Sequence, residues 1–204
     1  MRQNRNVEQD IVEAARKVFQ EKGYKEATMR DIATEANINM AMLHYYFRSK
    51  DNLFYIVFDE AFKMLYSEII KIITNNEMDL FTKIRTIVNE YITFFNEKPY
   101  LPQFIMGVVI RNPEKIGERM QRNTNLILAF NIFSEQIKME YEKGTIQQIS
   151  ALSLLLNIIS LCVFPAITRP VINEFLGVEN VTNVIKSELH KQEVADFIIK
   201  AIKR

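Results

Sequence analysis

The chain has 204 residues, of which 48% are hydrophobic and 25% are charged, and its net charge is +1. This composition is typical of a globular protein and excludes a disordered chain. The scarcity of glycine and proline (5 of each) favours helices throughout, whereas the low net charge gives only weak support for nucleic-acid binding.

The first predicted helix covers about Val7–Lys22. Its apolar residues recur at helical spacing and should form a buried stripe of Ile11, Ala15, Val18 and Phe19. Gly23 follows at the position where glycine commonly ends a helix. The preceding residues, MRQNRNVEQD, contain no apolar run and do not resemble a signal peptide.

Residues 28–50 predict two short helices joined by a tight turn. Thr28 is a good N-cap, and Asp31 can complete a capping box with it. Asn37 tolerates the left-handed conformation that a sharp turn needs, and Asn39 is a second N-cap. The next helix should run from about Met40 to Phe47.

The second of these helices has few residues for a core. Leu43 and Phe47 form its inward face, which leaves six residues pointing sideways or outward: Met40, Ala41, Met42, His44, Tyr45 and Tyr46. An ordinary helical hairpin with some exposed aromatic residues is one interpretation. The short turn, the aromatic outer face and the cations Arg48 and Lys50 just beyond it favour a DNA-binding helix-turn-helix.

Residues 9–54 resemble the N-terminal domain of the TetR family of bacterial transcriptional regulators. The matching pieces are IVEAARKVF from Ile11, the pair Gly23-Tyr24, Thr28 with IATEA from Ile32, and LHYYFRSKDNLF from Leu43. The family usually has glycine in place of Asn37 and tyrosine in place of His44. It commonly has small or polar residues where Met40 and Met42 stand, so the operator sequence does not follow from the resemblance.

The remaining helices are expected to form a second domain, so that residues 1–50 bind DNA and residues 51–204 bind a ligand and dimerise. The predicted fold is all-α with about nine helices. Prolines should kink or break the helix over Gln147–Leu176, and a linker near Val178–Val184 should precede the last helix. The helices predicted after residue 50 are Asp51–Asn76, Asp79–Lys98, Gln103–Arg111, Glu114–Lys143, Gln147–Leu176 and a final helix ending at Lys203.

The apolar run Ala151–Ile167 falls short of the roughly 20 residues of a membrane span and contains polar residues and Pro165. We therefore expect a helix buried in a core or a subunit interface, and no membrane partner. A single cysteine, Cys162, cannot form an internal disulfide and is consistent with a cytoplasmic location.

The helices over Gln147–Phe164 and Ser187–Lys203 carry more apolar surface than one buried side needs. The TetR resemblance implies that two such helices from each subunit form a four-helix bundle in a homodimer. The alternative is that both helices pack within the core of one subunit. A dimer would place two recognition helices on successive turns of the major groove.

The resemblance also implies an effector site for a small apolar or amphipathic molecule among the aromatic residues of the second domain. A plain hydrophobic core explains the same residues equally well. Arg169, between two prolines, could pair with an acidic ligand, but a solvated surface arginine is the favoured interpretation. The candidate ligand-binding residues are Phe62, Tyr66, Tyr91, Phe95, Phe104, Phe130, Asn131 and Asn157.

The predicted function is that of a repressor that leaves a near-palindromic DNA operator when an effector binds. Ala41 lies on the outward face of the helix that is predicted to contact DNA. The candidate phosphate contacts are Thr28, Tyr45, Tyr46, Arg48 and Lys50, and the candidate base contacts are Arg30, Asn39, Met40, Met42 and His44. Because residues 1–55 hold nine Lys and Arg against eight Asp and Glu, any positive potential must come from local clustering of Arg2, Arg5, Arg30, Arg48 and Lys50.

Three alternatives to this predicted function are considered. A protein partner, or none, could replace the effector, or the protein could be an activator. An enzyme is the remote alternative, because His44, His190 and Cys162 lie far apart without metal-ligand spacing and the sequence has no glycine-rich phosphate loop. No cofactor and no metal are therefore expected.

Overall fold

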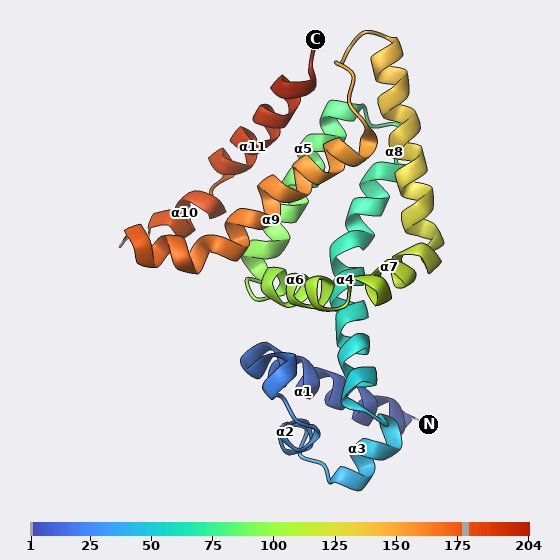
Figure 1. The fold of residues 1–204 in the computed structure, drawn as a ribbon, viewed down its shortest axis with the longest axis vertical. Helices are drawn as coiled ribbons and strands as arrows, with labels where there is room; N and C mark the ends of the chain where they lie inside the picture. The colour runs from blue at the N-terminus through green and yellow to red at the C-terminus, as the bar shows by residue number, and fades with distance from the viewer. Residues whose placement is uncertain (1, 177–179) are drawn as a thin grey trace. The chain divides into compact units, whose positions relative to one another are not determined.

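The computed structural model describes residues 2–176 and 180–204, with side chains described for 7–176 and 183–204. These residues form eleven α-helices and no strand (Figure 1). The helices are α1 (Arg2–Glu26), α2 (Met29–Glu35), α3 (Met40–Tyr46), α4 (Lys50–Thr74), α5 (Leu80–Glu97), α6 (Leu101–Arg111), α7 (Pro113–Arg122), α8 (Thr124–Glu142), α9 (Ala151–Leu176), α10 (Asn180–Lys186) and α11 (Glu188–Ile202). The all-α prediction is confirmed, with two helices more than expected.

The chain divides into two compact units, Met1–Met64 and Leu65–Arg204. Helix α4 belongs to both units, since it runs from Lys50 to Thr74. In the first unit, the predicted stripe of α1 is buried, and Phe54 of α4 meets Phe19 edge-on with 5.0 Å between ring centroids. Gly23 interrupts α1 with a positive φ of 69°, and helical residues continue beyond the predicted end at Lys22 to Glu26.

The turn between α2 and α3 has the predicted local chemistry. Thr28 and Asp31 form both hydrogen bonds of a capping box, and the side chain of Asn39 accepts from the Met42 N–H. Asn37 is the one non-glycine residue in the described chain with a positive φ, at 53°. These three features close α2, reverse the chain and begin α3 within a few residues.

The core of the second unit is built from α5, α8, α9 and α11, together with Ile69 and Ile73 of α4. Asp79 caps α5 by accepting from the Thr82 N–H, as helix-start signals predict. Helix α5 buries eight of its residues and packs against both α9 and α11. The C-terminus returns to the start of α9, because the Gln147 N–H donates to the carbonyl of Ile202 over 2.7 Å.

The predicted long helix over Glu114–Lys143 is wrong, because the structure has two helices that meet at Asn123. The Asn123 Oδ1 accepts from the Leu126 N–H and caps α8, while its Nδ2 donates to the Tyr66 hydroxyl on α4 (2.9 Å). An asparagine side chain that competes for backbone hydrogen bonds can start a new helix in the middle of an apolar pattern.

Helix α9 also differs from the prediction. It begins at Ala151 rather than Gln147. Pro165 and Pro170 lie inside it, so the predicted break does not occur, and the alternative of a kink stays a prediction. The predicted linker is in part α10, whereas Gly177, Val178 and Glu179 lie outside the described residues.

By length and composition α9 could cross a membrane, with a mean hydropathy of 2.1 over an 18-residue window, of which 28% is buried. A core helix of a soluble protein can have the same length and apolar composition. Its buried residues include Leu154, Ile158 and Cys162, which belong to the core of the second unit. Much of its remaining apolar surface is exposed in the single chain.

Candidate nucleic-acid interface

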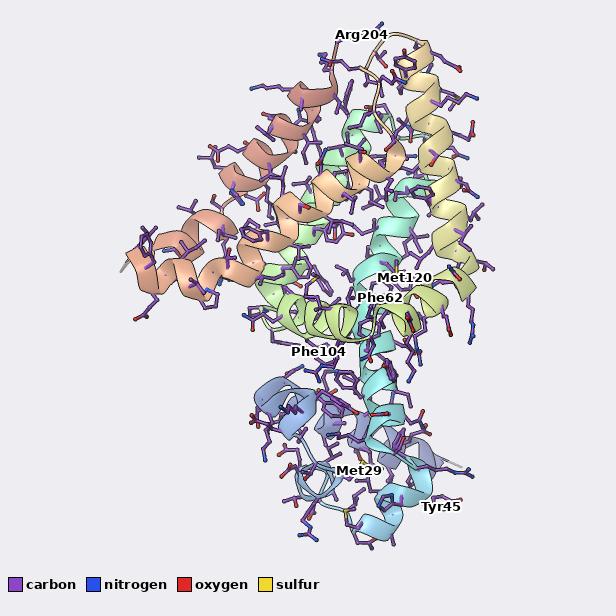
Figure 2. The ribbon with its side chains drawn as sticks, in the orientation of Figure 1. Met29, Tyr45, Phe62, Phe104, Met120 and Arg204 are labelled. Carbon is purple, nitrogen blue, oxygen red and sulfur yellow. The ribbon has the colours of Figure 1, made fainter. Side chains whose placement is uncertain are left out.

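Two buried anchors hold α3 against the first unit. Leu43 is fully buried and Phe47 is 2% exposed, which confirms the predicted inward face. Tyr45, labelled in Figure 2, is 79% exposed, and Met42 is 41% exposed. Large apolar side chains that stay in water on a short helix require a reason other than folding.

The other residues predicted for this face surround those two side chains. Ala41 and His44 are exposed, whereas Met40 is half-buried. Tyr46 is also half-buried and meets the Tyr45 ring edge-on, with 5.3 Å between centroids. The geometry therefore leaves Ala41, Met42, His44 and Tyr45 as the outermost side chains of α3.

The side chain of Asn39 already serves as the N-cap of α3. Its Oδ1 accepts from the Met42 N–H over 2.8 Å, which engages one of the two lone pairs of this oxygen, and its Nδ2 hydrogens remain available. A bidentate contact with adenine needs one acceptor and one donor from the same amide. The cap fixes the orientation of the Asn39 amide, so a paired contact with adenine has to share Oδ1 with the Met42 N–H.

Thr28 and Arg30 lie at the start of α2. The Thr28 hydroxyl donates to Asp31 Oδ2 over 2.7 Å and accepts from the Asp31 N–H. The Lys22 ammonium, 2.9 Å from Asp31, and the Thr28 hydrogen bonds lower the pKa of Asp31 to about 2. Arg30 is exposed one position before this carboxylate.

Lys50 has partners that the sequence did not indicate. Its Nζ donates to the carbonyls of Tyr24 and Ala27, each over 2.9 Å, and lies 4.4 Å from the centre of the Tyr24 ring. An ammonium has three donors, so one N–H remains for an outside acceptor. The structure therefore gives Lys50 a role in closing the turn after α1, beside the predicted phosphate contact.

The positively charged side chains near α2 and α3 differ in whether they form ion pairs. Lys17 pairs with Glu35, and Lys22 pairs with Asp31. Arg30 and Arg48 are exposed and enter no ion pair in the described part of the chain. The side chains of Arg2 and Arg5 lie outside the described ones. Unneutralised positive charge therefore remains at Arg30 and Arg48, even though the region is nearly neutral.

The eight candidate ligand-binding residues do not gather at one site. Tyr91 and Phe95 are buried and stack within the core, with 6.1 Å between ring centroids. Phe62 stacks on Phe58 in the first unit. The hydroxyl of Tyr66 accepts from Asn123. Of the remaining four, Phe104 is half-buried, and the exposed residues are Phe130, Asn131 and Asn157.

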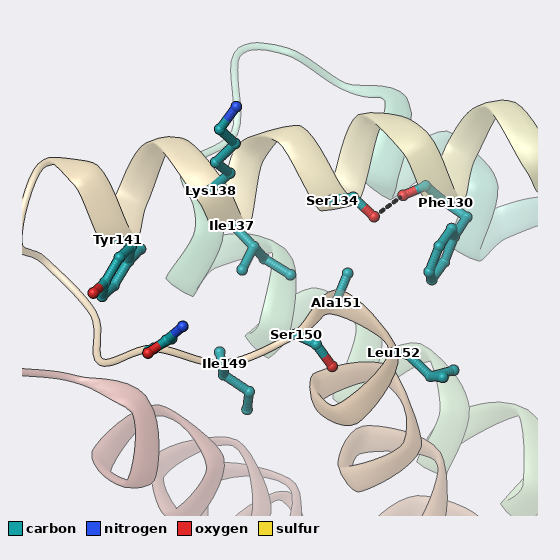
Figure 3. Close-up of a pocket in the computed structure, with 10 residues that line it drawn as sticks. Phe130, Ser134, Ile137, Lys138, Tyr141, Ile149, Ser150, Ala151 and Leu152 are labelled. Carbon is teal, nitrogen blue, oxygen red and sulfur yellow. Dashed lines mark hydrogen bonds between the residues drawn. The ribbon is translucent and has the colours of Figure 1, made fainter.

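Two open grooves in the second unit contain some of these residues. The larger, of about 400 Å³, lies between α8 and the start of α9. Figure 3 shows Phe130, Ile137 and Tyr141 projecting from α8 toward α9, whereas Lys138 points away. The smaller, of about 250 Å³, lies between α9 and α11 and includes Asn157, Ser160 and Phe197. Sequence patterns alone missed Tyr141 and Phe197 as groove residues, because a helical pattern does not show which faces of two helices meet.

Residues 11–55 match a family profile described as "Bacterial regulatory proteins, tetR family". Two relatives carry names that describe regulation. The nicotine-responsive transcriptional repressor HdnoR of Paenarthrobacter nicotinovorans is 29% identical over 112 residues, which cover 52% of this chain and 55% of HdnoR. The biofilm operon negative transcriptional regulator IcaR of Staphylococcus aureus is 26% identical over 155 residues, 71% of this chain and 78% of IcaR.

Solved structures agree on the fold over nearly the whole length. A TetR family transcription regulator from Marinobacter aquaeolei VT8 has a TM-score of 0.70 at 18% identity and covers 100% of both chains. The regulator FadR from Bacillus subtilis, solved in complex with stearoyl-CoA, has a TM-score of 0.64 at 16% identity and covers 95% of this chain and 98% of FadR. The likeness to these structures concerns the all-helical fold.

Proposed function

Since this chain belongs to the TetR family of bacterial regulatory proteins, we propose that it is a transcriptional repressor that binds an operator through the exposed face of α3. The observation that carries this proposal is the position of Tyr45 and Met42, which stay in solvent on a helix anchored by Leu43 and Phe47. A short helix with such a face fits the major groove. The names of HdnoR and IcaR favour repression over activation.

We assign the contacts by side-chain chemistry. Arg48 and Tyr45 are proposed to hold phosphates, with the remaining N–H of Lys50 beside them. Thr28 joins them only when its hydroxyl hydrogen turns from Asp31 to the phosphate. Met42 and His44 are proposed to face base edges, where a methionine favours thymine methyl groups. Arg30, Asn39, Met40, Ala41 and Tyr46 complete the proposed interface.

We propose that the working form is a homodimer in the cytoplasm. Helices α9 and α11 expose large apolar side chains that include Leu152, Leu156, Phe164 and Phe197. The groove of about 250 Å³ between these helices could receive side chains of a second copy. Two-fold symmetry would present two copies of α3 to half-sites roughly 34–36 Å apart, or a multiple of that distance.

An effector is proposed to act through α4, the helix that both units share. Its second-unit end is held by two side-chain hydrogen bonds. The Lys83 ammonium, which is buried, donates to the carbonyl of Ile73 over 2.6 Å, and Asn123 donates to Tyr66. A ligand that binds one position of α4 better than another would shift the population of DNA-binding molecules.

The proposal is tested by selecting bound duplexes from a random DNA pool with the full chain, followed by affinity measurements on the selected operator. We expect Tyr45→Ala to weaken operator binding about tenfold or more, because one interface residue of this type contributes about 1–3 kcal/mol. Ile110→Ala removes a large side chain that is 73% exposed on α6 and is the control at similar exposure. Failure to enrich any duplex, or equal losses in the two variants, would contradict the proposal.

A further inference from the structure

Arg169 lies on the buried face of α9. It continues a stripe of Ile158, Cys162 and Ala166, with spacings of four, four and three residues that keep one face of a helix. Arg169 is 8% exposed, so the favoured interpretation of a solvated surface arginine is wrong. Arg169 therefore lies largely out of solvent in the second unit, between Pro165 and Pro170 of the same helix.

No group in the described chain neutralises this cation. The Nη2 of Arg169 is buried without a hydrogen-bond partner, and no described side chain forms an ion pair with it. Helices α5, α6, α8, α10 and α11 all pack against α9, and no described carboxylate on them forms an ion pair with Arg169. The only acidic residue of α9 is Glu174, which is exposed.

A buried arginine cannot avoid this cost by losing its proton, because a guanidinium stays charged in proteins. A buried charge is retained at large free-energy cost unless an opposite charge and hydrogen bonds accompany it. Arginine also offers a planar fork of donors that matches carboxylate and phosphate groups. Because no described residue supplies such a group, an anion bound from outside the chain can take its place.

We propose that Arg169 anchors the anionic group, a carboxylate or a phosphate, of a small organic molecule that binds in the second unit. This inference builds on the proposed function, because such a molecule would be the effector. The binding step itself needs no DNA. A failure to bind DNA and a failure of this anion site are therefore seen in separate measurements.

The test is thermal unfolding of the full chain without DNA. The probes are acetate, hexanoate, decanoate, inorganic phosphate and decyl phosphate, with decanol as the neutral match of decanoate, all below micelle-forming concentrations. We expect at least one anion to raise the melting temperature of the wild type more than decanol does. A comparison of the shifts caused by the carboxylates and by the phosphates then identifies the head group.

Arg169→Gln should require at least about tenfold more of that anion for the same shift, since a charge-assisted pair is lost. The matched control is Arg122→Gln, because Arg122 is a surface residue of α7 whose side chain is 80% exposed. This control should respond as the wild type does. An unchanged response of Arg169→Gln would overturn the proposal, as would a wild type that responds to none of the anions or equally to decanol.

Arg169→Leu separates an anchor from a structural arginine. Removal of an uncompensated buried charge should leave the melting temperature of the free protein unchanged or raise it, because the apolar replacement suits the surroundings. The same variant should no longer be stabilised by the anion. A free protein that melts well below the wild type would instead identify Arg169 as a structural residue and overturn the proposal.

Discussion

At the scale of single residues, the polar side chains around α3 divide their donors and acceptors between the fold and the outside. Thr28 and Asn39 use oxygen atoms to cap α2 and α3. Lys50 uses two of its donors on the carbonyls of Tyr24 and Ala27. What remains for DNA is chiefly a set of donors and apolar faces, which suits phosphates and thymine methyl groups better than bidentate base pairing.

Lys50 offers a prediction in which two measurements separate its roles. Lys50→Met should lower the free energy of unfolding by about 1.5–3 kcal/mol, because two carbonyls lose a charged donor. Urea unfolding followed by circular dichroism measures this change. If the third N–H also holds a phosphate, the salt dependence of DNA binding should flatten by about one unit.

The control for this prediction is Lys25→Met, which removes an exposed lysine from the same end of α1. It should change neither the unfolding curve nor the order of affinities for different duplexes. A Lys50→Met variant as stable as the wild type would show that the hydrogen bonds to Tyr24 and Ala27 contribute little. An unchanged salt slope would remove Lys50 from the phosphate contacts.

At the scale of elements, the sequence predicted best where the signal is local. The capping residues, the left-handed Asn37 and the inward pair Leu43 and Phe47 all lie within α2, α3 and their turn, and each is found as predicted. Short-range hydrogen bonds and helical spacing determine these features, so one segment contains the information needed.

Prediction was poorer where a residue's partner is distant in the chain. The break at Asn123 depends partly on Tyr66 of α4, and the partners of Lys50 lie on the segment before α2. Arg169 became buried because α9 stays helical through two prolines. A periodic pattern does not identify such contacts, since they arise only when separate helices pack.

Asn37 gives the prediction at this scale. Asn37→Gly should leave stability nearly unchanged, because glycine reaches a positive φ without strain. Asn37→Ala should lower the free energy of unfolding by about 1 kcal/mol, because a Cβ atom disfavours the left-handed region. Urea unfolding of both variants measures the difference. Equal stabilities would mean that the turn between α2 and α3 relaxes to another conformation.

At the scale of the whole molecule, the exposed faces of α9 and α11 are difficult to explain in a single copy. Leu152 and Leu156 are each more than half exposed, and Phe164 and Phe197 are each 65% exposed. Side chains of this size release about 1.5–3 kcal/mol each when they are fully buried. A second copy that covers both helices would recover much of this free energy.

Leu156→Asp tests this surface against a matched position. Leu156 is 53% exposed on α9, and Leu128 is 55% exposed on α8, so each substitution makes the same chemical change at nearly the same exposure. A carboxylate introduced into an apolar interface would have to be desolvated in both copies, which should weaken a dimer about a hundredfold or more. Sedimentation equilibrium across a dilution series measures that change, and Leu128→Asp should assemble like the wild type.

If α9 and α11 form the interface, operator affinity should fall together with dimer content in Leu156→Asp, because one copy of α3 contacts too few base pairs for tight binding. A Leu156→Asp protein that remains dimeric would place the interface elsewhere, and a wild type that stays monomeric at all concentrations would contradict the dimer itself.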